Sequence, residues 1–163
     1  MPKFFVQQKQ VEGNKLKIQD GDVNHIKNVL RMKPKENINV CIMPDGINTI
    51  CQIEKIEEKE IICSIIKKEE NTTESNIKVS IFQGLPKSDK MELIIQKSVE
   101  LGVYNIFPVE MKRCVVKLKE QDIKKKITRW QKISEVAAKQ CGRDIIPEIK
   151  ECIKIDQICE KIP

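Results

Sequence analysis

The residues best placed to do chemistry are basic side chains that follow apolar segments in the second half of the sequence. Lys87 comes directly after the turn Gly84-Leu85-Pro86, which ends a strand-like run, and Arg113 follows a second such run. Arg143 comes just past the end of a long helical pattern. In a chain that alternates strands and helices, ligands bind in the loops at the strand ends. These positions therefore predict a binding site for an anionic group.

Other polar residues each allow two interpretations. Arg31, six residues after the only histidine, His25, either binds a phosphate through its planar guanidinium or is a solvated side chain beside a packed helix. Lys87, Lys90 and Lys97 form either a basic binding cluster or a solvated helix face.

Arg143 has the same ambiguity at the end of its helix. It either complements the helix dipole or reaches a ligand, which its neighbours Gln140 and Gly142 would allow to approach closely. Trp130 lies at helical spacing with apolar residues and is predicted to be core rather than a platform for stacked bases.

Seven cysteines and one histidine give no metal-binding spacing. Most of the cysteines lie in apolar runs, as expected of small core residues in a reducing compartment. Cys114, beside Lys112 and Arg113, is the best candidate for an activated thiol, but the sequence places no general base near it. We therefore predict no metal, no covalent catalysis and a cytoplasmic protein.

Length and charge narrow the class of protein. The 163 residues suffice for one ordinary domain or two small ones, and the net charge is +6. Residues 1–70 hold twelve Lys and Arg against eleven Asp and Glu, whereas residues 71–163 hold eighteen against thirteen. This asymmetry favours a polyanionic partner for the second part, unless lysine is simply abundant in the source proteome. No apolar run approaches the roughly 20 residues of a membrane span, so no membrane partner is predicted.

Residues 1–70 are predicted to form a small β-barrel. Three β-branched runs, a tight turn and a short helical pattern follow one another at the spacing typical of barrels. The runs cover residues 38–42, 47–53 and 61–66, the turn is Pro44-Asp45-Gly46, and the helical pattern covers residues 22–31. Residues 67–76 lack apolar side chains and are predicted to be a linker.

Residues 71–163 change to the alternating strand and helix order of a mostly parallel sheet. Strands are predicted at residues 77–81 and 105–110, and helices at residues 91–102 and 123–141. An extended piece at residues 145–151 and a last helix at residues 156–162 complete the chain.

Several ordered motifs run along nearly the whole chain. They are His25-x-x-x-x-Leu30-Arg31, the loop from Lys87 to Lys90, the segment Gln96 to Val103, the segment Lys112 to Lys117, and Arg129-Trp130 followed by Ala137 to Arg143 and Pro147. Together they resemble the ribosomal RNA small subunit methyltransferase E family. Cys114 and Cys141 stand where relatives typically carry serine, which is a change between small residues.

The resemblance implies a mixed α+β and α/β fold. It consists of an N-terminal PUA-like β-barrel over residues 1–70 and the first part of a SPOUT α/β-knot methyltransferase domain over residues 71–163. The implied activity transfers a methyl group from S-adenosylmethionine to N3 of a uridine in 16S rRNA of the small ribosomal subunit. The resemblance also implies a homodimer when the protein is full length.

The glycine content departs from the family pattern. The family holds its cofactor in glycine-rich loops near the C-terminus, whereas this chain has six glycines and no cluster of them. From this we expect a chain that is cut short, with the cofactor site in the missing part and no methyltransferase activity of its own.

The implied reaction suggests roles for the polar residues. N3 of uracil must lose a proton, and a cation near the uracil carbonyls would stabilise the resulting anion in an unstacked base. Arg113 and Arg143 are predicted to be these cations, with Glu100 as the proton acceptor. The residues predicted to bind RNA are His25, Arg31, Lys87, Lys90, Lys97 and Gln140.

Two other classes of protein remain open at this stage. The chain could be a non-enzymatic module that only holds RNA, or a small α/β protein whose basic face binds another protein. Titration with S-adenosylmethionine separates the enzyme from the module. A steep fall of RNA affinity with salt separates RNA binding from protein binding, because phosphate contacts release counterions.

Overall fold

The computed structural model describes residues 3–69, 73–87, 89–111 and 120–161, and the chain divides into two compact units. The first unit comprises Met1–Glu74 together with Gly142–Ile145, and the second comprises Ser75–Cys141 and Ile146–Pro163. The first boundary lies inside the predicted linker. The return of residues 142–145 to the first unit was not predicted from the sequence.

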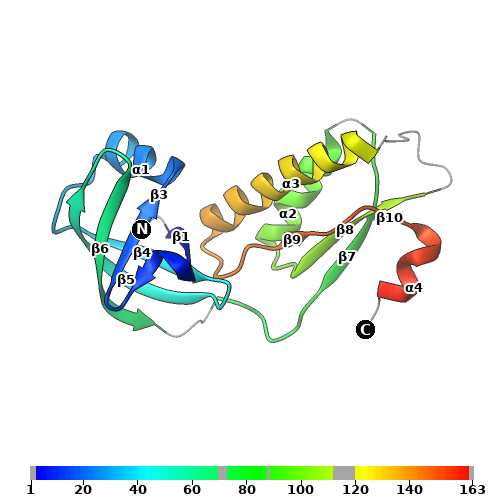
Figure 1. The fold of residues 1–163 in the computed structure, drawn as a ribbon. Helices are drawn as coiled ribbons and strands as arrows, with labels where there is room; N and C mark the ends of the chain where they lie inside the picture. Colours follow the sequence, from blue (N-terminus) through cyan, green and yellow to red (C-terminus); the bar gives the residue numbers. More distant parts are fainter. Residues whose placement is uncertain (1–2, 70–72, 88, 112–119, 162–163) are drawn as a thin grey trace. The chain divides into compact units, whose positions relative to one another are not determined.

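The first unit is a curled six-stranded sheet with a short helical segment at one end (Figure 1). The strand order is β1-β4-β5-β6-β3-β2; β1 and β4 are parallel, and the other neighbours are antiparallel. The strands are β1 (Lys3–Gln7), β2 (Val11–Glu12), β3 (Lys15–Gln19), β4 (Asn37–Met43), β5 (Ile47–Ile56) and β6 (Glu60–Glu69). The helical turns are η1 (Gln8–Gln10), α1 (Gly21–Asn24) and η2 (His25–Val29).

Alternation of side chains along the strands builds the core of this unit. Phe4 and Val6 of β1 and Leu16 and Ile18 of β3 point inward with the β-branched residues of the longer strands. Ile26, from η2, is buried among them. The predicted barrel and its helical pattern are therefore confirmed, except that β6 continues through residues 67–69, which were predicted to be linker.

The second unit is a parallel sheet with helices packed against it (Figure 1). Its central strand β8 (Asn105–Glu110) pairs with β7 (Ser80–Gly84) on one side and with β9 (Glu148–Ile149) and β10 (Ile153–Lys154) as further partners. The helices are α2 (Lys90–Glu100), α3 (Glu120–Cys141), η3 (Ile155–Gln157) and α4 (Ile158–Lys161).

The predicted elements of this unit are confirmed with shifted bounds. The strand expected at residues 77–81 is β7, which begins at Ser80, where pairing with β8 starts; Ile77 and Val79 precede it and are exposed. The extended piece expected at residues 145–151 becomes the two short strands β9 and β10. As predicted, α2 buries Met91, and Trp130 of α3 lies in the core.

No helix in the described part of the chain is long and apolar enough to cross a membrane.

Candidate functional site

The carboxyl ends of three parallel strands meet at one edge of the sheet in the second unit. Gly84 of β7 and Ile153 of β10 both lie in register with Val109 of β8. In open parallel sheets this edge is where ligands bind, because the connecting loops leave from it. We refer to it as the carboxyl edge.

The loop after β7 begins with a close approach between backbone and side chain. The Leu85 amide donates to the Val109 carbonyl at 3.0 Å, which continues the pairing one residue past β7. A Cβ at Gly84 would lie 3.2 Å from Cγ of Met111, so a larger residue would require Met111 to move. The loop then carries Lys87 outward, and Lys90 starts α2; both are exposed at the carboxyl edge.

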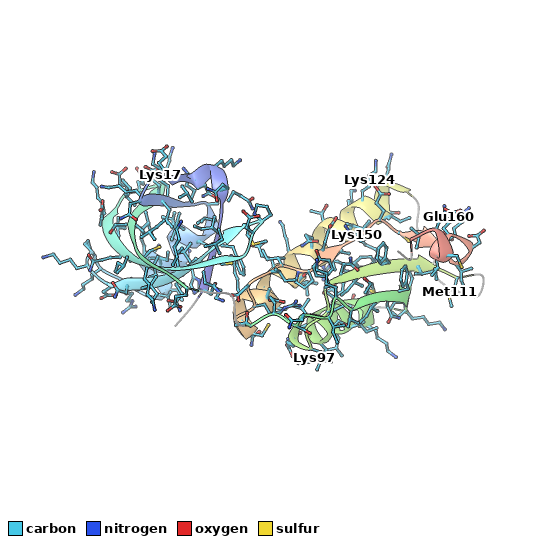
Figure 2. The ribbon with its side chains drawn as sticks, turned by 90° about the horizontal axis from the view of Figure 1, so that it is seen from below. Lys17, Lys97, Met111, Lys124, Lys150 and Glu160 are labelled. Carbon is cyan, nitrogen blue, oxygen red and sulfur yellow. The ribbon has the colours of Figure 1, made fainter. Side chains whose placement is uncertain are left out.

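Lys97 and Glu100 lie at the other end of α2. With 1.5 Å per residue, the 11 residues of this helix span about 16 Å. Figure 2 accordingly shows Lys97 well apart from Met111, which follows the carboxyl end of β8. The structure therefore brings Lys87 and Lys90 together but separates them from Lys97 and Glu100.

Glu100 is held as an ion pair. Lys97 Nζ lies 2.8 Å from its Oε2, and Gln96 Nε2 donates to Oε1 at 3.0 Å. The hydrogen bond from Lys97 lowers the pKa of Glu100 below its ordinary value. A lower pKa makes a carboxylate a weaker proton acceptor, so this environment does not favour the predicted role, which remains a prediction.

His25 and Arg31 occur on one turn of the first unit. The His25 ring is exposed and lies edge-on to Phe4, with ring centroids 6.0 Å apart. The Leu30 amide donates to the His25 carbonyl at 2.9 Å and closes the turn. Arg31 follows with φ of 53° and an exposed side chain, which is accessible to a phosphate.

Arg143 is far less accessible than the sequence suggested. Its side chain belongs to the first unit, and the residue is only 6% exposed. Its Nη2 lies 2.6 Å from Oε2 of Glu74, and its Nε donates to Oε1 of Glu74 at 3.2 Å. This two-point ion pair already compensates the guanidinium charge. Arg143 is therefore engaged within the first unit, and its predicted catalytic role remains a prediction.

Asp144 is a second buried charge beside Arg143. It is 0% exposed, and its carboxylate accepts hydrogen bonds from Lys3 and Thr73. Burial raises the pKa of Asp144. The hydrogen bonds from Lys3, Thr73 and Asn48 lower this pKa by more than burial raises it, so it lies below its ordinary value.

Glu74 behaves in the same way. Burial raises its pKa, but Arg143 and two backbone amides lower it below the ordinary value. A carboxyl group whose folded pKa is lowered stabilises the fold above its unfolded pKa, and this stabilisation is lost as the pH falls through the folded value. Both groups are therefore ionised and stabilising at neutral pH.

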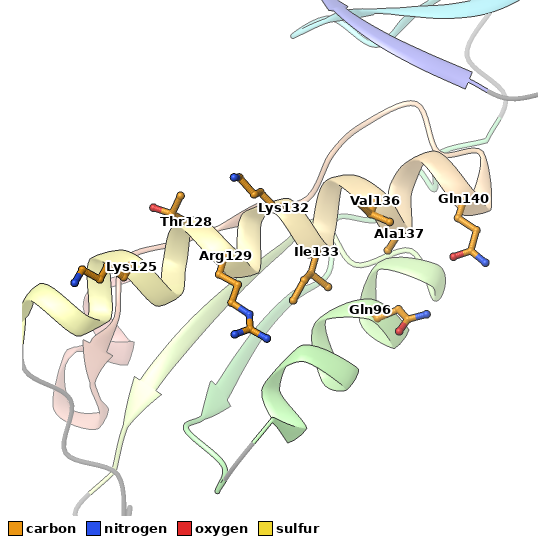
Figure 3. A pocket seen from close by; sticks show the side chains of 9 residues that line it. All are labelled: Gln96, Lys125, Thr128, Arg129, Lys132, Ile133, Val136, Ala137 and Gln140. Atoms are coloured by element: carbon orange, nitrogen blue, oxygen red, sulfur yellow. The ribbon is translucent and has the colours of Figure 1, made fainter. Parts of the chain in front are cut away.

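Gln140 lines a cavity between α2 and α3 of about 560 Å³. Figure 3 shows Ile133 and Ala137 of α3 facing Gln96 of α2 across it. Lys125, Arg129 and Lys132 line its cationic side, and Arg129 pairs with Glu92 at 2.8 Å. An apolar floor with a basic rim suits an amphipathic or anionic partner better than a small neutral one.

Some predicted residues lie outside the described residues. Arg113 and Cys114 are among them. The catalytic role of Arg113 therefore remains a prediction. Within the described part of the chain, no group of His, Cys, Asp and Glu could hold a metal ion. The described cysteines are free thiols.

No sequence pattern marks Lys3, Glu74 or Asp144 as ion-pairing residues. Glu74 lies in the stretch predicted to be a linker, and its partners are about 70 residues away in the chain. No local pattern marks such a pair, because only the fold brings the two segments together.

Comparison with known families gives the class of protein. Residues 73–163 match the RNA methyltransferase domain family, and residues 18–66 match the RNA methyltransferase PUA domain. The two matches fall on the α/β unit and on the curled sheet. The fold is that of an RNA methyltransferase with an attached PUA-like domain.

Individual relatives narrow the class to one family. The ribosomal RNA small subunit methyltransferase E of Bacillus subtilis is 34% identical over 99% of this chain. The structure of the Neisseria gonorrhoeae enzyme of that name, bound to S-adenosyl methionine, has 32% identity over 100% of this chain and a TM-score of 0.86. A methyltransferase from Legionella pneumophila with bound cofactor has 30% identity over 98% of this chain and a TM-score of 0.84.

The chain belongs to the ribosomal RNA small subunit methyltransferase E family, which confirms the resemblance and the predicted fold class. It spans 64% of the length of the Bacillus subtilis relative and 66% of each of the two structures.

Proposed function

We propose that the protein methylates N3 of a uridine in 16S rRNA of the small ribosomal subunit, with S-adenosylmethionine as methyl donor. The observation that carries the proposal is the match of an RNA methyltransferase domain and its PUA domain to consecutive parts of this chain. The names of the relatives support rRNA as the substrate, and two relatives contain the methyl donor.

The described residues do not by themselves provide a fitting site for the methyl donor. At the carboxyl edge the charged side chains of Lys87, Asp89 and Asp156 are all exposed, so they do not form an enclosed set of partners for an adenosyl group. We therefore assign no described residue to the methyl donor and derive no step through it.

The chemistry at uracil limits which side chains can assist. The N3 proton must leave, and a cation near the carbonyls stabilises the anion that remains. Arg113 keeps its predicted role in this step. Arg143 would first have to leave Glu74, and Glu100 would have to accept a proton despite its pairing with Lys97.

Arg31 and Lys87 are the better supported RNA contacts. Each side chain is exposed and lies just past the end of a helix or strand, Arg31 after η2 and Lys87 after β7. His25 lies on the same turn as Arg31, and Lys90 lies at the carboxyl edge with Lys87.

The homodimer implied by the resemblance remains a prediction.

Binding of this chain to a small-subunit rRNA fragment tests the proposal. We expect Lys87→Ala to weaken binding several-fold and to reduce the slope of log K against log salt by about 1, as for one lost phosphate contact. The matched control is Lys78→Ala, an exposed lysine that precedes the amino end of β7, for which we expect little change.

Affinity that does not depend on salt would contradict phosphate binding altogether. Equal effects of the two substitutions would contradict the placement of RNA at the carboxyl edge. Salt-dependent binding of a complete protein that transfers no methyl group would instead favour the non-enzymatic RNA-binding module.

A further inference from the structure

Residues 142–145 connect two elements of the second unit but fold with the first. Gly142 follows α3 directly, and Ile145 is followed by Ile146 and then by β9. The chain therefore passes between the units three times, after Glu74, after Cys141 and after Ile145. We call residues 142–145 the return segment.

One carboxylate of the first unit holds three consecutive residues of the return segment. Glu74 Oε1 accepts from the Asp144 amide at 2.9 Å and from the Ile145 amide at 3.3 Å. The same carboxylate forms the two-point ion pair with Arg143. Glu74 is also the residue after which the chain first leaves the first unit. The same side chain therefore marks the end of that stretch and holds the return segment.

The outer face of the sheet supplies the rest of the binding surface. Phe5, Cys41 and Asn48 lie in one row across β1, β4 and β5. Cys41 lies between Val40 and Ile42, which point into the core, so its side chain points to the opposite face. It is nevertheless 0% exposed, because the return segment covers it: Cys41 Sγ donates to the Asp144 carbonyl at 3.1 Å.

Charge and hydrogen bonding are balanced within this surface. Lys3 and Arg143 carry two positive charges, and Glu74 and Asp144 carry two negative ones. Lys3 Nζ donates to the Gly142 carbonyl at 2.9 Å and also pairs with the Asp144 carboxylate. Groups buried this deeply are stable only when paired, so the return segment fits this surface specifically.

We propose that the return segment is a clasp: the first unit binds residues 142–145 through Glu74 and Lys3, and the clasp can open without unfolding of the sheet beneath it. In this proposal Arg143 is a positioning residue that holds the return segment on the first unit through Glu74. The proposal does not depend on methyl transfer.

Cys41 provides a reporter for opening of the clasp in the full chain. A pulse of N-ethylmaleimide followed by peptide mass spectrometry measures the labelling rate of each cysteine. We expect Glu74→Gln, which keeps the side-chain shape but removes the charge, to speed labelling of Cys41 about tenfold or more. Cys51 and Cys63, inside the core, should still be labelled much more slowly than Cys41.

The matched control is Glu69→Gln, which alters an exposed carboxylate at the end of β6 that pairs with Lys67. It should leave labelling of Cys41 unchanged. Unchanged labelling of Cys41 in Glu74→Gln would overturn the clasp. Labelling of all three cysteines at a common, faster rate would also overturn it, because the segment would then open only with the whole unit.

Amide hydrogen exchange in the unsubstituted chain is a second test that needs no variant. The Asp144 and Ile145 amides, which both bond Glu74, should exchange with a common opening free energy. That opening should be easier than for the Ile53 amide, which bonds the Glu36 carbonyl within the sheet unit. Exchange at the rate of an unprotected peptide, or at the rate of Ile53, would contradict the proposal.

Discussion

Glu74→Ala is expected to destabilise the first unit by about 3–5 kcal/mol, because it removes the carboxylate that forms a two-point ion pair with the buried Arg143 guanidinium. The substitution also removes the acceptor of two backbone amides, those of Asp144 and Ile145. Few single substitutions outside a hydrophobic core cost as much.

Urea unfolding followed by circular dichroism measures this loss. The matched control is Glu148→Ala, which removes an exposed carboxylate paired with Lys150 and should cost less than about 1 kcal/mol. The double variant Glu74→Ala/Arg143→Ala should recover part of the stability, because no buried charge is left unpaired. A loss for Glu74→Ala as small as that of the control would show that Arg143 finds water or another partner.

Ile53→Ala is expected to cost the first unit about 2–5 kcal/mol. The side chain is 0% exposed and lies in the centre of the apolar cluster, so its removal leaves a cavity that the strands around it cannot fill completely. A change of this size should weaken protection throughout the sheet, since β5 pairs with both β4 and β6.

Native-state hydrogen exchange of the amides in β5 and β6 measures this change within the first unit alone. The control is Ile66→Ala on β6, the same substitution at a side chain that is 56% exposed, with an expected change within about 0.5 kcal/mol. Similar losses at both positions would mean that the core is less tightly packed than the structure indicates.

Periodic patterns made most of the fold predictable. Alternation in β4 and β5 and the helical spacing of Met91, Ile95 and Val99 identify the buried faces, because burial follows the geometry of each element. The turn at Gly46 was also predictable, since φ of 66° there requires a residue that tolerates the left-handed region.

The environment of Arg143 could not be predicted in this way. The sequence shows a basic residue after a helix, which is equally typical of a ligand contact and of a helix-end charge. Its actual partner, Glu74, is 69 residues earlier in the chain and lies in a segment without apolar residues. Contacts of this kind depend on tertiary structure and leave no local pattern.

The position of α2 explains why the grouping of the basic residues could not be predicted from the sequence. Lys87, Lys97 and Glu100 are close in sequence, but a helix carries them from one edge of the sheet to the other. Sequence distance therefore suggested one basic cluster where the structure has two separate groups. The prediction for Lys87 rests on the end of β7 and not on its lysine-rich neighbourhood.

The most direct test of the proposed function is the nucleoside content of small-subunit rRNA in the source organism. Deletion of the gene that encodes this chain, followed by mass spectrometry of 16S rRNA fragments, measures each methylated uridine separately. We expect the loss of 3-methyluridine at a single position and its return when the gene is restored. An unchanged set of methylated uridines after deletion would contradict the proposed function.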